Sequence, residues 1–154
     1  MATEYPYEIR VRWSGGPDSG TRSHEAYPRA HEITAAGPPP IPGSADVGAF
    51  RGDADRWNPE QLLTAAVAQA HLLWYLHLCT ADGVVVTSYE DTATGLLVEG
   101  DTDHVGEVVL RPRVTVADPA TAERARALHA VAVERSFVAN SVRFPVRVEA
   151  HVTA

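Results

Sequence analysis

The sequence has 154 residues, 45% of them hydrophobic, with one cysteine and a formal net charge of −7, which suits a single domain over residues 1–154 whose core needs no disulfide or metal. An acidic chain without clustered Lys and Arg is a poor match for phosphates, so we expect no nucleic-acid partner. The N-terminus shows no signal pattern and no apolar run of membrane-spanning length, so we expect a soluble cytoplasmic protein without a membrane partner.

The N-terminal part of the chain is predicted to be extended. Tyr5–Trp13 alternates apolar and charged residues, as a half-buried strand does. The turn-forming residues Ser14–Gly20 follow, so residues 21–34 should return as the second strand of a hairpin. Pro28 interrupts that strand and requires an edge position or a bend. Residues 35–57, rich in Pro and Gly, are predicted to form a long irregular connection.

A long helix should begin after Asn58. Asn is a good N-cap, and Pro59 suits the first helical position, where its missing N–H costs nothing. Apolar residues then recur at helical spacing until Ala81–Gly83 stops the helix. Because apolar residues cover most of its circumference, we expect the helix to be largely buried.

The C-terminal half alternates strands and a second helix. Residues 84–100 and 107–116 have strand character. Asp118 and Pro119 begin a helix whose predicted apolar side comprises Ala125, Leu128, Val131 and Ala132. Residues 136–142 are predicted to turn, and residues 144–152 to form the last strand. Strands grouped with two buried helices indicate an α+β domain.

Two stretches together resemble motifs of the OsmC/Ohr family, the osmotically inducible and organic hydroperoxide resistance proteins. The stretch RGDADRWNPEQLLTAAVAQAHLLWYLHLC is similar to the family's N-P-E-x-L opening of its central helix, and LHAVAVERSFVANSVRFPV is similar to its second motif. The resemblance covers nearly the whole chain. It implies an α+β fold with an N-terminal β-hairpin, two central helices packed on an antiparallel sheet, and an intertwined homodimer with active sites at the subunit interface.

Known members of the family reduce organic hydroperoxides with two cysteines and no bound cofactor. The thiolate of the first becomes a sulfenic acid, which the second converts to a disulfide. The resemblance places the first cysteine at Ala70 and the second at Ser136, so both thiols are absent. It matches Glu60 to a glutamate that orients an arginine, and Arg29 is our candidate for that arginine.

The remaining nucleophiles are weak substitutes for those cysteines. Cys79 lies nine residues after Ala70, half a turn around the helix and about 13 Å along it. We expect Cys79 to be a packed hydrophobe, with a redox-sensing thiol as the alternative. A hydrolase built on Ser136 needs a positioned base, such as His71 or His129. Otherwise the Ser136 hydroxyl bonds to backbone at a helix end.

Histidines in the first helix do not form a metal motif. His71 and Tyr75 share a face, whereas His71 and His77 diverge, and no H-x-x-x-H or H-E-x-x-H pattern occurs. We therefore expect no metal. Our hypothesis is a family member without thiol peroxidase activity that keeps an interfacial apolar pocket for a hydrophobic small molecule, with His71, Trp74 and Phe137 as candidate lining residues. The alternatives are an active hydroperoxide reductase that uses Cys79 and a hydrolase that uses Ser136.

Overall fold

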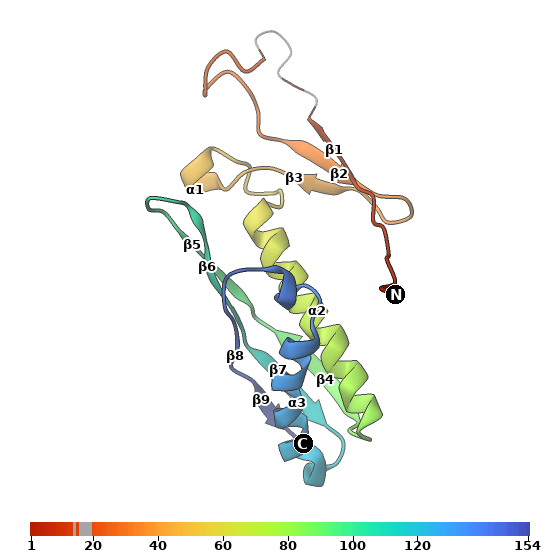
Figure 1. Cartoon of the computed structure of the whole chain (residues 1–154). Helices are drawn as coiled ribbons and strands as arrows, with labels where there is room; N and C mark the ends of the chain where they lie inside the picture. The colour runs from red at the N-terminus through yellow and green to blue at the C-terminus, as the bar shows by residue number, and fades with distance from the viewer. Residues whose placement is uncertain (14, 16–19) are drawn as a thin grey trace. The chain divides into compact units, whose positions relative to one another are not determined.

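The computed structural model describes residues 1–13, 15 and 20–154 (Figure 1). The chain separates into two compact units, Met1–Pro59 and Glu60–Ala154, which are described in turn. Of the predicted turn at Ser14–Gly20, only Gly15 and Gly20 lie within the described residues.

The first unit is built on a three-stranded antiparallel sheet in the order β1-β2-β3. Its elements are β1 (Arg10–Trp13), β2 (His31–Thr34), β3 (Ile41–Gly43) and the one-turn helix α1 (Val47–Phe50). The predicted strand from Tyr5 is wrong before Arg10. Pro28 lies before β2 and not within it. β2 is the central strand of the sheet, where a residue without an N–H could not donate a ladder hydrogen bond. The connection predicted to be irregular contains both β3 and α1.

The first unit exposes its large apolar side chains. None of the buried hydrophobic residues of the described chain belongs to this unit, and every residue of β1 is exposed. Its exposed large hydrophobic residues, after Met1, are Tyr5, Tyr7, Ile9, Val11, Trp13, Ile41, Val47, Phe50 and Trp57. A three-stranded sheet needs an apolar face covered by another layer. The apolar surface of this sheet therefore lacks a cover within the described residues of its own unit.

The long helix of the second unit, α2 (Pro59–Ala81), confirms the predicted start and end. Its burial differs from the prediction, because only one stripe of residues spaced four apart is fully buried: Val67, His71, Tyr75 and Cys79. Leu73, on another face, is 64% exposed. The helix is also long and apolar enough, by length and composition alone, to cross a membrane, a test that the core helix of a soluble protein also passes.

The strands of the second unit form two three-stranded ladders. Their order is β4-β7-β9 and β5-β6-β8, with parallel pairing only for β7–β9 and β6–β8. The strands are β4 (Val86–Asp91), β5 (Thr94–Val98), β6 (His104–Leu110), β7 (Pro112–Val116), β8 (Val146–Val148) and β9 (His151–Thr153). The family resemblance implied an antiparallel sheet, whereas both ladders are mixed. The three predicted strands are each split in two, and each crosses from one ladder to the other.

The second helix, α3 (Ala122–Arg135), follows the short 3-10 turn η1 (Pro119–Thr121). Asp118 caps this turn by accepting a hydrogen bond from the Ala120 N–H, as its position before Pro119 predicts. Of the predicted apolar side, Ala125, Leu128 and Ala132 are buried. These residues pack with the C-terminal half of α2 and with β7 and β9, whereas Val67 packs with β6. Figure 1 shows α2 and α3 side by side against the strands.

A short 3-10 turn, η2 (Ala139–Ser141), occupies the segment that was predicted to turn.

β5 approaches the first turns of α2 closely at Gly95. A Cβ atom at this position would lie 2.3 Å from the Thr64 Oγ1 atom. A larger residue would have to displace the Thr64 hydroxyl, so glycine suits this close approach of helix and strand.

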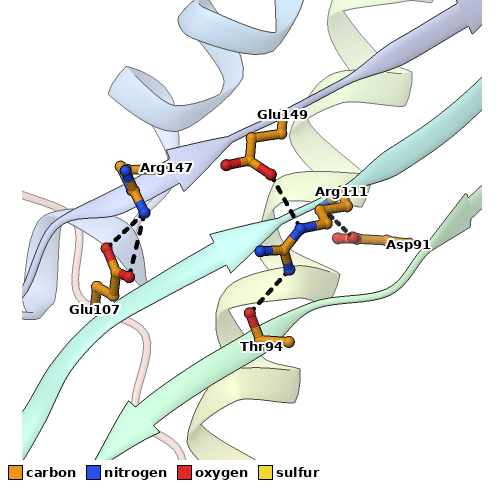
Figure 2. A network of polar contacts seen from close by, with 6 residues as sticks. All are labelled: Asp91, Thr94, Glu107, Arg111, Arg147 and Glu149. Atoms are coloured by element: carbon orange, nitrogen blue, oxygen red, sulfur yellow. Dashed lines mark hydrogen bonds and ion pairs between the residues drawn. The ribbon is translucent and has the colours of Figure 1, made fainter.

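Arg111 joins the segments at which the strands cross between ladders (Figure 2). It is the single residue between β6 and β7, and its backbone N–H donates to Asp91 at the end of β4. Its guanidinium donates to Glu149, which lies between β8 and β9, at 3.0 Å and to Thr94 at the start of β5 at 2.9 Å. One side chain therefore links all three extended segments where they bend.

We predict that Arg111→Met lowers the free energy of unfolding by about 1 kcal/mol, since it removes two charge-assisted hydrogen bonds at a half-exposed site. The matched control is Arg147→Met. Arg147 contacts only Glu107 among the residues in Figure 2 and should cost less than about 0.5 kcal/mol. Urea titrations of both variants measure the difference. Equal losses would contradict the assigned role of Arg111.

Candidate functional site

Ala70 lies beside the buried stripe of α2, where it is half-buried. One helical turn later on the same face is Trp74, whose ring meets that of Phe137 edge to face at a centroid distance of 5.6 Å. Phe137 is the neighbour of Ser136. This ring contact therefore brings the segments that carry the two substituted positions alongside each other. Phe137 remains 76% exposed, so the aromatic pair reaches the surface of the described chain.

Ser136 ends α3 and is buried, with an exposed fraction of 1%. Its Oγ accepts a hydrogen bond from the Ala139 N–H at 3.2 Å, and its own N–H donates to the Val133 carbonyl. The prediction of a hydroxyl that bonds to backbone at a helix end is confirmed. The hydroxyl shapes the turn into η2.

Cys79 closes the buried stripe near the C-terminal end of α2 and is 1% exposed. Burial raises the pKa of its thiol, an effect that the contact with Tyr75 partly opposes. A raised pKa disfavours the thiolate, which is the nucleophilic form. The prediction of a packed hydrophobe at this position is confirmed.

His71 and His129 form a buried pair that links the two helices. Nε2 of His71 and Nδ1 of His129 share a hydrogen bond of 2.9 Å, and the side chains are 1% and 3% exposed. The ring of Tyr75 stacks on His129 at a centroid distance of 3.9 Å and on His71 at 6.2 Å. As predicted, His71 and Tyr75 share a face, while His77 points elsewhere, against Trp74.

Burial keeps this pair neutral. It lowers the pKa of His71 to about 4, and together with the charge of His71 it lowers the pKa of His129 to about 3. The outer nitrogens, Nδ1 of His71 and Nε2 of His129, are buried without a hydrogen bond in the part of the chain that the structure describes. In the sequence, both histidines were candidate bases for Ser136, and His71 was also a candidate pocket residue, but nothing there indicated that they pair. Their pairing depends on two helices that lie far apart along the chain.

The residues expected to support the catalytic cysteine lie in different units. Glu60 is in the first turn of α2, and its Oε2 is buried without a hydrogen-bond partner among the described residues. Arg29 belongs to the first unit. Its guanidinium donates to the carbonyls of His24 and Tyr27 and lies 4.1 Å from the centre of the Tyr27 ring.

Two of the cavities formed by the described residues lie in the second unit. One, of about 660 Å³, is bounded by Leu63 of α2, the start of β6 and residues 142–145. The other, of about 550 Å³, lies between α3 and β8 and has His129 in its lining. No group of three or more His, Cys, Asp or Glu side chains that could hold a metal occurs among the described residues.

The histidine pair predicts a pH-dependent stability. The fold favours neutral imidazoles, whereas a histidine in the unfolded chain has a pKa of about 6.5. Below pH 6.5 the unfolded state therefore binds more protons than the folded state. The free energy of unfolding is therefore not reduced by the pair above pH 6.5, and it decreases as the pH falls toward about 4. Chemical denaturation between pH 7 and 5 should show a slope of up to about 1.4 kcal/mol per pH unit for each histidine.

A His129→Leu variant should reduce this slope, whereas His77→Gln, at an exposed position of α2, should leave it unchanged. A wild-type stability that stays constant from pH 7 to 5 would be inconsistent with a buried neutral pair.

Comparison with solved structures gives matches over nearly the whole chain. An OsmC-like protein of unknown function from Vibrio cholerae has a TM-score of 0.86 and 28% identity, covering 96% of this chain and 100% of that one. An organic hydroperoxide resistance protein OsmC from Legionella pneumophila has a TM-score of 0.68 and 17% identity, covering 99% and 100%. These matches confirm the α+β fold implied by the sequence motifs.

A third structure is that of an organic hydroperoxide resistance protein from Vibrio cholerae with captopril bound in one of the active sites. It has a TM-score of 0.64 and 19% identity, covering 99% of this chain and 94% of that one. No curated protein matches the chain. The family model for OsmC-like proteins matches residues 52–151, which include α2, α3 and the strands from β4 to β8, and so this chain belongs to the OsmC-like family.

Proposed function

We propose that the chain forms a homodimer that has no thiol peroxidase activity and binds an apolar small molecule beside Ala70, Trp74 and Phe137. The observation that supports this most directly is Ala70. The family's motif has its peroxidatic cysteine at this position, whereas the side chain here is only a methyl group. Peroxide reduction through a sulfenic acid needs a thiolate sulfur, and neither Ala70 nor Ser136 has one.

Cys79 is a poor replacement for that thiolate. It is buried in the stripe that faces the core, and the pKa of its thiol is raised. Sulfur oxidation requires both thiolate character and access for the peroxide. Peroxide reduction by Cys79 is thus the weaker alternative.

A hydrolase based on Ser136 has little support either. Nucleophilic serine needs a base within hydrogen-bonding reach. Both candidate bases, His71 and His129, share a hydrogen bond with each other, while the Ser136 hydroxyl accepts from a backbone N–H. The pair therefore acts as a link between α2 and α3 in this proposal.

Uncovered apolar surface supports the homodimer. The first unit exposes the side chains of Val11, Trp13 and Ile41, and α2 exposes Leu73. Surfaces of this kind mark protein interfaces, and a second copy of the chain is the partner that the family resemblance implies. In this proposal α2 is a core helix of the dimer, and the protein is soluble and cytoplasmic.

Glu60 retains the carboxylate that the family resemblance pairs with an arginine. A buried carboxylate oxygen without a partner is costly unless a cation or donor meets it. We propose that an arginine, with Arg29 as the candidate, meets Glu60 in the dimer. The captopril-bound relative indicates that this fold accommodates small organic molecules, and here the rings of Trp74 and Phe137 offer an apolar contact.

We predict no turnover of cumene hydroperoxide with a dithiol reductant above the level of a Cys79→Ser variant. The measurement is the rate of peroxide loss under excess reductant. Turnover that disappears with Cys79→Ser would overturn the proposal in favour of Cys79 chemistry.

The double variant Ala70→Cys with Ser136→Cys is the matched gain-of-function test. It should reduce cumene hydroperoxide, whereas each single variant should not complete a disulfide cycle. An inactive but folded double variant would show that the site no longer admits an organic peroxide beside position 70.

For the homodimer, we predict a molar mass near twice 16.6 kDa in light scattering after size-exclusion chromatography. Leu73→Asp should shift the population toward monomer, because a charge would be buried at the interface, whereas Leu73→Met should not. A wild-type monomer at micromolar concentration would refute the dimer.

A further inference from the structure

The cavity at the start of β6 arises where one ladder is incomplete. β6 pairs with β5 from His104 onward, but with β8 only from Val108 onward. Residues 142–145, which lead into β8, meet β6 where the Val108 N–H donates to the Pro145 carbonyl. Before that point the two segments separate, and the cavity of about 660 Å³ lies along them. This volume is within the range of small-molecule sites.

Most side chains that line this cavity are apolar. Among them, Leu63, Val105 and Phe144 are half-buried. Val105 and Phe144 also pack against the core cluster around Val67, so the core holds them in place while part of their surface stays accessible. An aromatic ring adds favourable edge-to-face or offset contacts when it meets another ring. Phe144 therefore favours a ligand with an aromatic body.

Arg143 supplies a cation in the same lining. Its side chain forms no hydrogen bond or ion pair within the described residues, and it is exposed, so a ligand can reach it. By contrast, Arg147, further along the same segment, is paired with Glu107. Among the described residues that line the cavity there is no Asp or Glu, although the chain carries 20 of them. A free guanidinium beside an apolar wall is suited to a carboxylate, which it can bind with two parallel hydrogen bonds.

The other polar groups nearby are already engaged. Nδ1 of His104 lies 2.8 Å from the Thr102 carbonyl oxygen. Because a carbonyl only accepts, Nδ1 carries the proton of the neutral ring, and Nε2 is left as an acceptor that offers a carboxylate nothing. The carboxylate of Asp103 accepts from the Gly100 N–H within the turn. Arg143 is therefore the group that would hold an anion here.

We propose that the cavity at the start of β6 binds a small aromatic monocarboxylate, whose ring packs against Phe144 and Val105 and whose carboxylate pairs with Arg143. This site is separate from that of the proposed function. Leu63 lies two helical turns, about 10 Å, before Ala70 on α2, and neither Ala70 nor Phe137 lines the cavity.

The test titrates the full chain at pH 7 with three probes by calorimetry: hydrocinnamate, hydrocinnamyl alcohol and octanoate. Hydrocinnamate should bind saturably at millimolar concentration, and more weakly at high ionic strength, because salt screens an exposed ion pair. The alcohol should bind at least about fivefold more weakly, since it lacks the charge-assisted pair. Octanoate should bind at least about twofold more weakly, since it lacks a ring. No saturable binding of hydrocinnamate, or an equal affinity for either other probe, would overturn the proposal.

Two pairs of variants locate the site. Arg143→Gln should weaken hydrocinnamate at least about fivefold, whereas Arg113→Gln, at an exposed arginine of β7 outside the lining, should bind like the wild type. Thr102→Trp, at an exposed position of the lining, should weaken hydrocinnamate and its alcohol alike by filling the cavity. Its control is Thr92→Trp, at an exposed position between β4 and β5. Wild-type affinity in Arg143→Gln would contradict the assignment.

Backbone amide resonances of the ¹⁵N-labelled chain distinguish this site from the one beside Ala70. Hydrocinnamate should shift the amides of Gly106 and Phe144. Shifts that centre on Ala70 and Phe137 instead would place the ligand in the site of the proposed function and overturn this assignment. Neither the peroxidase assay nor the molar mass enters this test, so the two proposals succeed or fail separately.

Discussion

The second unit depends on one packing constraint, the buried stripe of α2. Val67, His71, Tyr75 and Cys79 lie one turn apart, so they form a single line along the helix. Val67 packs on β6, while Tyr75 and Cys79 pack on β7, β9 and α3. The helix therefore spans both ladders, and Arg111 joins the strands at the place where they pass from one ladder to the other.

The same constraint explains why position 70 is the chemically informative one. A residue of the stripe is enclosed by the core, as the buried thiol of Cys79 shows. A residue beside the stripe, such as Ala70, is only half-buried and shares its face with Trp74, which reaches Phe137. Alanine at this position supplies no thiol, and it suits the helix because alanine is a strong helix former.

Local signals predicted the helices well and the sheet less well. Asn58-Pro59 and Asp118-Pro119 marked two helical starts correctly, because capping depends on neighbouring residues. The strand from Tyr5 was predicted too long, and the split strands and parallel pairing of β8 and β9 were not foreseen. The split strands and the parallel pairs involve contacts between distant segments, such as that of Arg111 with Glu149, 38 residues later, and periodicity does not identify such partners.

By itself, the sequence determined the family motifs, the start and end of α2, and the absence of sulfur at Ala70 and Ser136. Each of these is a property of residue identity or of short-range spacing. Only the tertiary structure decided that His71 meets His129, that Cys79 is enclosed, and that Trp74 meets Phe137. These contacts join α2 to residues about 60 positions later, and folding brings such distant side chains together through the burial of apolar surface along the stripe.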